Sequence, residues 1–255
     1  MENFLQIFFI SIIQGVTEFI PVSSSAHIGI LSKIFGYQDV ELIISVSAHF
    51  GSLVAVIFFF KKEILEFFKN KDLFFKLTIS SIPLGLFGFI LLKYNIVSYL
   101  RSLEVIGFTT IIFGLLLYIS DKFKIKQSLR SNFDIKSALA IGFFQVLALV
   151  PGVSRSGIVI TGARFLRFNR VDSAKISFLL SIPALGAWSL YGFYDLAQKD
   201  NNLLNIGAFL TTFLSFIFSY LTIKYFLVYM KKFNLSIFVI YRVLLGSILL
   251  IMAYL

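Results

Sequence analysis

Apolar residues run along this chain in stretches of about 20 residues, separated by short polar segments. A helix needs about 20 apolar residues to cross the hydrocarbon core of a bilayer. Two longer apolar segments, 3–36 and 137–168, are interrupted in the middle by proline, glycine and serine. The uninterrupted stretches predict six transmembrane helices, near residues 42–60, 77–93, 105–120, 174–194, 206–228 and 236–254.

The two interrupted segments carry the polar motifs "PVSSSAH" and "PGVSRSG". Proline, glycine and serine clusters break helices. We therefore expect each segment to form two half-helices folded into a re-entrant helical hairpin. The broken backbone in its middle would lie buried in protein or face a wet cavity, because lipid cannot satisfy free backbone groups.

Composition agrees with this pattern. The chain is 58% hydrophobic and 14% charged, and its mean hydropathy of +0.90 excludes a water-soluble domain with an ordinary surface. We expect one integral, all-α polytopic membrane domain over residues 1–255. We also expect the first helix to be retained, because no basic segment precedes it. The absence of cysteine excludes disulfides, thiolate catalysis and cysteine-ligated metals.

Basic residues collect in four of the polar segments. Segments 61–76, 122–136, 164–175 and 224–232 hold five, five, four and three of them, which is 17 of the 23 lysines and arginines. The positive-inside rule places such segments in the cytoplasm, so we expect both termini on the exterior side. The net charge of +10 thus indicates membrane topology, and we expect no nucleic-acid partner.

The same charge pattern requires segment 137–168 to enter and leave the membrane on the cytoplasmic side. Each half of the chain then has one hairpin followed by three spans, and an odd number of spans inverts the second copy. This predicts an inverted-topology repeat with halves 1–121 and 122–255. The local similarity of "FIPVSSSA" to "LVPGVSRSG" supports the repeat.

Helix breaks of this kind favour anion binding. The second half-helix of each hairpin begins with unpaired N–H groups and the positive end of its dipole, and both attract anions. We expect the two breaks to meet in one buried anion site. Arg155 in "SRSG" adds a permanent charge and a planar donor fork suited to phosphate oxygens. The alternative is an arginine that caps carbonyls.

The polar residues of the first hairpin form two clusters. Gln14 and Glu18 share a helix face at spacing i, i+4, while Ser24 and His27 share one at i, i+3. An ionisable residue in the membrane is a functional hypothesis by default. Beside a phosphate, Glu18 is either protonated or bridged to it by a divalent cation.

Structural alternatives exist for each of these residues. Glu18 would then be a neutral acid, and the serines would be helix caps or turn formers. His27 would be a core histidine whose ring nitrogens have hydrogen-bond partners. His49 favours helix packing, and a role for Arg242 inside the last span is left open.

Together, "QGVTEFIPVSSSAH" (14–27) and "PGVSRSG" (151–157) resemble the two signature motifs of the undecaprenyl-diphosphate phosphatase family, the bacitracin-resistance proteins of bacterial envelopes. The motifs occur in the expected order, in a chain of fitting length and hydropathy. The resemblance therefore covers essentially the whole protein.

This resemblance implies a hydrolase of the bacterial inner membrane that removes the terminal phosphate of undecaprenyl diphosphate. The product is the lipid carrier for peptidoglycan synthesis, and bacitracin acts by competing for the substrate. The resemblance further implies a divalent cation, Mg²⁺ or Ca²⁺, contact with bilayer lipids, a homodimer, and a site open to the outer face. It assigns catalytic roles to Glu18, Ser24 and His27, phosphate binding to Arg155 with Ser154 and Ser156, and metal binding to Glu18 and Gln14. We also expect Ser23 and Ser25 to bind phosphate.

The sequence departs from the family pattern at two positions. Gln14 stands where some relatives carry Glu, which removes one possible metal ligand. Val159 stands where a hydroxyl residue is expected, so that one phosphate hydrogen bond is missing or comes from Thr161.

Three functions fit these observations. The first is the phosphatase, in which Ser24 or a water attacks and His27 transfers a proton. The second is a transporter or flippase of polyprenyl phosphate lipids, which would use the same anion site without chemistry. The third is a structural membrane protein. Glu18, Ser24 and His27 beside the anion site favour the enzyme, because a carrier has less use for them.

Overall fold

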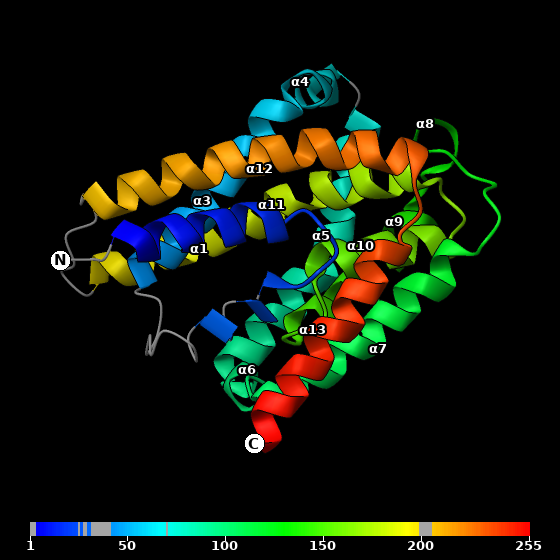
Figure 1. The fold of residues 1–255 in the computed structure, drawn as a ribbon. Helices are drawn as coiled ribbons and strands as arrows, with labels where there is room; N and C mark the ends of the chain where they lie inside the picture. Colours follow the sequence, from blue (N-terminus) through cyan, green and yellow to red (C-terminus); the bar gives the residue numbers. More distant parts are fainter. Residues whose placement is uncertain (1–3, 25, 28–29, 32–41, 70, 199–205) are drawn as a thin grey trace.

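The structure, a computed structural model, describes residues 4–24, 26–27, 30–31, 42–69, 71–198 and 206–255. Within these ranges the regular elements are helices, and no strand forms beyond one isolated bridge between Gln127 and Phe168. Figure 1 shows the helices in one bundle. The predicted all-α class is confirmed.

Six of the described helices are long and apolar enough to cross a membrane. They agree with the six predicted spans, so the chain is a multi-pass membrane protein. These helices are α3 (Leu42–Phe59), α5 (Lys71–Lys93), α7 (Leu103–Asp121), α11 (Arg170–Gln198), α12 (Ile206–Lys232) and α13 (Ser236–Tyr254).

Between α3 and α12, small polar residues fill the interior and large apolar ones face outward. Ser215 and Ser219 are fully buried, whereas Phe209 on the same helix is 71% exposed. A side-chain carbon at Gly51 would lie 2.3 Å from the Thr212 carbonyl oxygen. In lipid, small residues drive helix association because they let backbones approach closely. The buried serines therefore mark the α3–α12 contact as a membrane-type interface.

The remaining helices are shorter. Helix α1 has 14 residues and rises about 21 Å, too little to cross a bilayer by itself. The helix break predicted at "PGVSRSG" is present, because α9 and the 3-10 turn η1 end at Leu149 and α10 begins at Arg155. The re-entrant path of both segments stays a prediction. The bounds are α1 Phe4–Thr17, α4 Lys61–Lys69, α6 Ile96–Tyr99, α8 Leu129–Asn132, α9 Ile135–Val146, η1 Leu147–Leu149 and α10 Arg155–Phe165.

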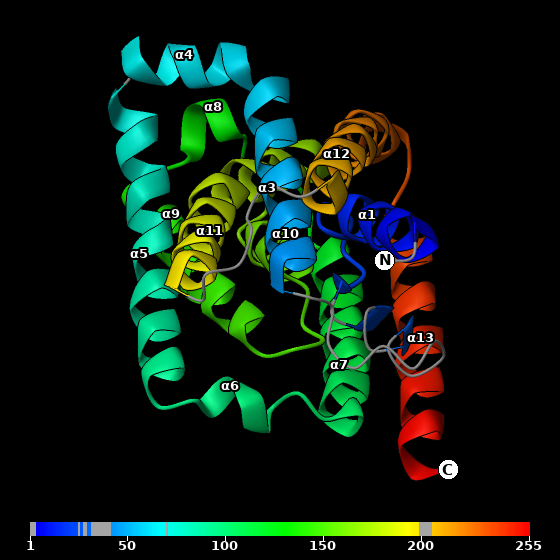
Figure 2. The ribbon, with the colours of Figure 1, turned by 90° about the vertical axis from the view of Figure 1, so that its left-hand side faces the viewer.

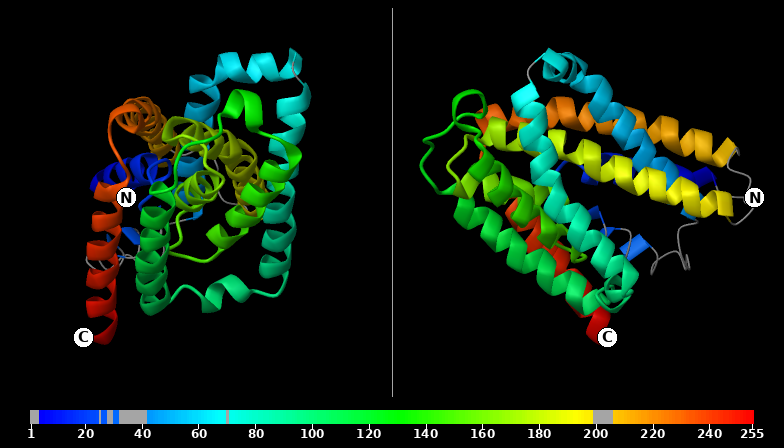
Figure 3. Two further views of the ribbon diagram at one scale, coloured as in Figure 1. Left: turned by 90° about the vertical axis from the view of Figure 1, so that its right-hand side faces the viewer. Right: turned by 180° about the vertical axis from the view of Figure 1, so that it is seen from behind.

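Helix contacts come in matched pairs. Helix α1 packs against α12, and α9 packs against α5; α3 packs against α11, and α7 against α13. Figure 3 shows α7 and α13 side by side. Exchanging the two halves of the chain would map this set of contacts onto itself. The inverted repeat with halves 1–121 and 122–255 stays a prediction, which the matched contacts support.

Two of the basic segments lie at the same end of the bundle. In Figure 2, α4 and α8 lie at one end, while α6 and the C-terminus lie at the opposite end. Segments 61–76 and 122–136, which the charge pattern assigned to one side, therefore share an end of the molecule.

At this basic end, Asp121 ties four elements together. Its two carboxylate oxygens accept from Arg170 Nε at 2.7 Å and Nη2 at 3.0 Å, and its backbone carbonyl accepts from Arg164 Nη2 at 3.0 Å. The Leu235 N–H also donates to the carboxylate, at 3.1 Å. Bidentate pairs of this kind are among the stronger polar contacts in proteins. The contact of Arg164 with Asp121 fixes the far end of α10, the helix whose first residue is Arg155.

Candidate functional site

Both helix breaks contain a serine with an unusual backbone. Ser23 has φ of 76° and Ser154 has φ of 68°, a range that non-glycine residues rarely adopt. Ser154 follows Ser23 by 131 positions, the same spacing as that between Gln14 and Gln145. Each such residue costs on the order of 1–3 kcal/mol and persists where the surroundings enforce it, often at functional sites. The two breaks thus share the same unusual backbone conformation, a positive φ at a serine.

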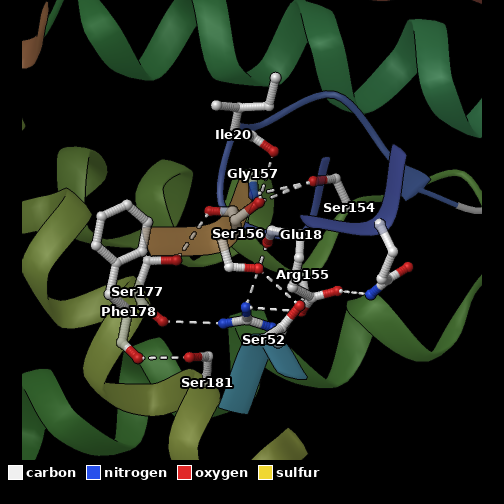
Figure 4. A network of polar contacts seen from close by, with 12 residues as sticks. Glu18, Ile20, Ser52, Ser154, Arg155, Ser156, Gly157, Ser177, Phe178 and Ser181 are labelled. Carbon is white, nitrogen blue, oxygen red and sulfur yellow. Dashed lines mark hydrogen bonds and ion pairs between the residues drawn. The ribbon is translucent and has the colours of Figure 1, made fainter. Parts of the chain in front are cut away.

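An ion pair joins the two breaks. Arg155 Nη2 donates to Glu18 Oε1 at 3.0 Å (Figure 4). Gln14 Nε2 donates to Glu18 Oε2 at 2.8 Å. The side chains of Glu18 and Arg155 are 9% and 13% exposed. Gln14, Glu18 and Arg155, which the sequence predicted to share one site, therefore lie in direct contact.

The first turn of α10 also binds the first break. Ser156 Oγ donates to the Ile20 carbonyl at 2.9 Å, and Arg155 Nη1 donates to the Ser177 carbonyl of α11 at 2.9 Å. Ser154 Oγ accepts from the Gly157 N–H at 3.2 Å and so caps the helix. Ser154 and Ser156 thus both belong to the network around Arg155.

The start of α10 retains capacity for an anion. The first N–H groups of a helix have no partner within it, and the Ser154 cap satisfies that of Gly157. In the part of the chain that the structure describes, no hydrogen bond engages the backbone N–H groups of Arg155 and Ser156. With the Arg155 guanidinium beside them, these groups suit phosphate oxygens.

Arg242 of α13 is a member of the site to which the sequence analysis gave no role. Its fully buried side chain donates to the carbonyls of Gly152 (3.1 Å) and Val153 (3.0 Å) in the second break and of Pro21 (3.4 Å) in the first. It also donates to the Thr110 carbonyl of α7 at 3.0 Å. Among the described residues its contacts are with carbonyls, and no carboxylate pairs with it.

Glycines make room for this guanidinium. A side-chain carbon at Gly157 would lie 3.0 Å from Arg242 Nη1, and one at Gly114 would lie 3.1 Å from Arg242 Cβ. The positive charge of Arg242 is therefore next to the first turn of α10. The signal in the sequence was an arginine in the middle of an apolar span. A charged residue is costly there, so its presence indicates a function.

His27 makes two hydrogen bonds outside the Glu18–Arg155 pair. Its Nδ1 lies 2.7 Å from the Ser23 carbonyl, and its Nε2 lies 2.5 Å from the Tyr241 hydroxyl. Ser24 is partly exposed, and among the described residues no hydrogen bond engages its hydroxyl. Ser25, predicted to bind phosphate, lies outside the described residues.

Three further positions can be placed. Val159 is fully buried, and the Thr161 hydroxyl donates to the Gly157 carbonyl at 2.8 Å, inside α10. His49 Nδ1 lies 2.7 Å from the Ser45 carbonyl, and its ring lies against Trp188. These contacts agree with a packing role for His49.

The donor set fits a divalent cation that is shared with a substrate. Gln14 is 1% exposed, and its Oε1 has no hydrogen-bond partner among the described residues. Glu18 supplies a carboxylate beside it. No group of three histidine, cysteine or acidic side chains occurs within the described ranges. One carboxylate and one amide oxygen suit Mg²⁺ or Ca²⁺ when phosphate oxygens complete the coordination.

Comparison with known proteins gives a consistent result. Residues 7–248 match the family described as bacitracin resistance protein BacA. The undecaprenyl-diphosphatase of Pelagibacter ubique (strain HTCC1062) is 46% identical over 254 residues, which cover 99% of each chain. The undecaprenyl-diphosphatases of Saccharophagus degradans and Campylobacter curvus are 39% and 38% identical, over at least 96% of each chain.

Proposed function

This chain belongs to the BacA family of bacitracin resistance proteins, and from that premise we propose how its two broken segments act on undecaprenyl diphosphate. The protein is a membrane hydrolase that dephosphorylates this lipid to undecaprenyl phosphate. It thereby recycles the lipid carrier of cell-wall synthesis and confers bacitracin resistance.

The terminal phosphate binds at the start of α10. A diphosphate monoester brings about two to three negative charges at neutral pH. Three positive groups attract this negative charge: Arg155, the first N–H groups of α10 and the buried Arg242. The negative carboxylate of Glu18 repels it. The phosphate therefore replaces Glu18 as the partner of Arg155. Ser154 and Ser23 add hydroxyl groups around it, and Ser156 would add a donor by leaving the Ile20 carbonyl. Phosphate binding by Ser25 stays a prediction.

Gln14 and Glu18 would hold a divalent cation, Mg²⁺ or Ca²⁺. The unpartnered Gln14 Oε1 and the Glu18 carboxylate released from Arg155 support this assignment. When bound, the cation supplies positive charge to the phosphate oxygens. The protein residues orient the diphosphate so that its terminal phosphorus faces the first break.

The reaction is a phosphoryl transfer, in which positioning and charge neutralisation do most of the work. The attacking oxygen is that of Ser24 or of a water molecule. It forms a bond to the terminal phosphorus while the bond to the bridging oxygen breaks, and the electron pair leaves with undecaprenyl phosphate. His27 takes the proton of the attacking oxygen. With Ser24 as nucleophile, water then releases phosphate from a phosphoserine.

We place the protein in the bacterial inner membrane with the basic end in the cytoplasm, both termini exterior and the site open to the outer face. The shared end of α4 and α8 supports this orientation. Because the chain has no cysteine, single substitutions Leu255→Cys and Lys122→Cys would test it. An impermeant thiol reagent added to intact cells should label the first and spare the second. Formation of a homodimer stays a prediction.

A lipid partner is supported by an apolar cavity of about 370 Å³ between α3, α4, α5 and α11. The hydroxyls of Thr78 and Ser81 in its wall both donate to carbonyls of their own helix, so they offer the cavity no free donor. Exposed Lys61 and Lys62 lie on α4, which contributes to the cavity wall. We assign the cavity to an acyl chain of an anionic phospholipid, since juxtamembrane lysines attract such headgroups.

A pair of variants tests the lipid assignment. Ser81→Trp fills the cavity, whereas Gly85→Trp places the same side chain outside its lining, where a side-chain carbon meets nothing within 4 Å. Phosphatidylglycerol should raise the melting temperature of wild type and of Gly85→Trp, and should raise that of Ser81→Trp much less. An equal rise in all three would refute the assignment.

The observation that carries the proposed site is the Glu18–Arg155 ion pair, because it brings the two broken segments together. The first test measures phosphate release from undecaprenyl diphosphate by purified protein, with and without a chelator. Release should need a divalent cation and should be lost in Arg155→Ala and Glu18→Gln. Full release by both variants would exclude this site, and transport of the lipid phosphate in vesicles would then be measured as the alternative.

A further inference from the structure

Tyr241 of α13 contacts His27 in two ways. The hydroxyl lies 2.5 Å from His27 Nε2, and the rings stack with centroids 5.6 Å apart and planes 11° from parallel. The two residues are 214 positions apart in the sequence. No motif in the sequence analysis included Tyr241.

The second contact of His27 determines which ring nitrogen carries the proton. A carbonyl oxygen can only accept, so Nδ1, at 2.7 Å from the Ser23 carbonyl, is the protonated nitrogen. In the neutral imidazole, Nε2 is then the acceptor, and the Tyr241 hydroxyl donates to it. The nitrogen that can take up a proton therefore points at Tyr241.

This geometry restricts the path of a proton to His27. Nε2 has a single lone pair, and the Tyr241 hydroxyl occupies it. A proton from another oxygen reaches Nε2 only through the phenol oxygen. Tyr241 would give its own proton to Nε2 and accept one from that oxygen, which leaves the phenol neutral and His27 as imidazolium.

The position of Tyr241 is fixed by its neighbour in the chain. Arg242 is fully buried and bonded to four carbonyls of α7 and the two breaks, which anchors this turn of α13. Tyr241, by contrast, is 43% exposed. Its hydroxyl is thus held on a rigid element, and its side chain is open to other molecules.

We propose that Tyr241 is the proton relay of the phosphatase site, which carries the proton of the attacking oxygen to His27. The inference rests on the proposed role of His27 as the acceptor of that proton. Tyr241 donates its proton to Nε2 as the new bond to phosphorus forms, and the attacking oxygen donates its proton to Tyr241. Afterwards His27 gives its extra proton back to Tyr241, and Tyr241 gives its own proton to a phosphate oxygen of the departing product, which restores both side chains.

The test uses three single variants in the full-length protein. Tyr241→Phe removes the hydroxyl and keeps the ring stacking, while His27→Asn keeps a donor towards Ser23 but removes the acceptor nitrogen. Tyr254→Phe, an exposed tyrosine of the same helix, is the control. We expect Tyr241→Phe and His27→Asn each to lower kcat by about 10²–10⁴-fold, the usual contribution of general acid–base catalysis, with little change in KM. The control should retain wild-type kinetics.

A double variant separates a relay from an independent contribution. Residues that act as one unit have strongly non-additive effects. Adding Tyr241→Phe to His27→Asn should therefore lower kcat no further. Wild-type kcat in Tyr241→Phe, a multiplicative loss in the double variant, or a loss confined to KM would each overturn the relay.

The failure of the underlying proposal has a different signature. If His27→Asn keeps wild-type kcat while wild type releases phosphate, then His27 is not the proton acceptor, and the relay falls with it. Melting temperatures of all variants are measured alongside. A loss of kcat in Tyr241→Phe that follows a lower melting temperature and returns at reduced temperature would also overturn the relay.

Discussion

Arg155 and Glu18 are 137 positions apart in the sequence, and their side chains meet at 3.0 Å. One comes from the first residue of α10 and the other from the turn that follows α1. Each neutralises the other in a largely buried place, where an unpaired charge is costly. The pair therefore stabilises the buried side chains without substrate, and in the proposed function a phosphate that binds Arg155 replaces Glu18 as its partner.

The first prediction concerns Arg155. Arg155→Ala should lower kcat/KM by about 10²–10³-fold, the usual cost of one lost donor to a developing charge. Arg155→Lys should recover part of the activity, because the charge remains while the donor fork is lost. Phosphate release by purified variants measures both effects. Arg101→Ala, at an exposed arginine before α7, serves as the control; equal losses at Arg101 and Arg155 would contradict a specific role.

The second prediction concerns the cation. Gln14→Glu adds a second carboxylate beside Glu18, which repels it unless a cation lies between them. The variant should therefore melt at a lower temperature than wild type in chelator and gain more from added Mg²⁺ or Ca²⁺. Glu18→Gln should gain nothing from the cation. Glu66→Gln on the exposed face of α4 is the matched control; a cation response in Glu18→Gln equal to that of wild type would remove Glu18 from the metal site.

The third prediction concerns Arg242. Arg242→Met removes the guanidinium donor from four carbonyls, of which that of Gly152 also accepts from the Thr110 hydroxyl. We expect a loss of about 3 kcal/mol or more in stability. Arg242→Lys keeps the charge with three donors on one nitrogen and should lose less. Melting temperatures in one detergent compare the two variants. If Arg242→Met were as stable as wild type, the carbonyl contacts would not hold the two breaks.

The fourth prediction concerns Gly152 in the second break. Its φ is +91°, and a side-chain carbon there would lie 2.0 Å from Thr109 Oγ1 and 2.6 Å from the Ile106 carbonyl. Gly152→Ala should therefore lower the melting temperature and the activity together. Gly186→Ala in α11, where nothing lies within 4 Å of the added carbon, should be neutral or slightly stabilising. Similar behaviour of both variants would mean that the break tolerates a shifted backbone.

The fifth prediction concerns pH and the start of α9. The Ser137 N–H donates to Asp134 Oδ1 at 2.8 Å and holds the pKa of Asp134 below its ordinary value of about 3.9. A carboxyl group with a lowered pKa stabilises the folded state at pH values above its pKa in the unfolded chain. This contribution is lost as the pH falls through its pKa in the folded protein. Asp134→Asn keeps a cap that does not titrate. Its melting temperature should therefore fall less than that of wild type between pH 6 and pH 3; parallel curves would contradict this cap.

The membrane spans were predictable because crossing lipid demands a long run of apolar residues, whatever the tertiary contacts. The residues at which the helices begin and end were less predictable. Helix α5 begins at Lys71 and not at Leu77, since a helix continues into solvent where hydropathy no longer marks it. The Glu18–Arg155 meeting was predictable in outline, because ionisable residues inside apolar segments need a partner.

Other parts of the site had no signal of this kind. The partners of Arg242 are backbone carbonyls of Pro21, Gly152 and Val153, and backbone groups are the same in every sequence. The Tyr241–His27 contact depends on the register of α13 against the first hairpin. Both contacts join segments about 90 or more positions apart in the chain, and tertiary packing decides them.

The complete burial of the Arg242 guanidinium has a consequence for ion permeability. Where two helix breaks meet inside a membrane, the free backbone groups can bind water, and a chain of water molecules would conduct protons. A fixed positive charge at such a point repels protons and metal cations, as arginines do in pores that must exclude them. Arg242 thus places a fixed positive charge between the two breaks, and such a charge disfavours the passage of protons and metal cations there.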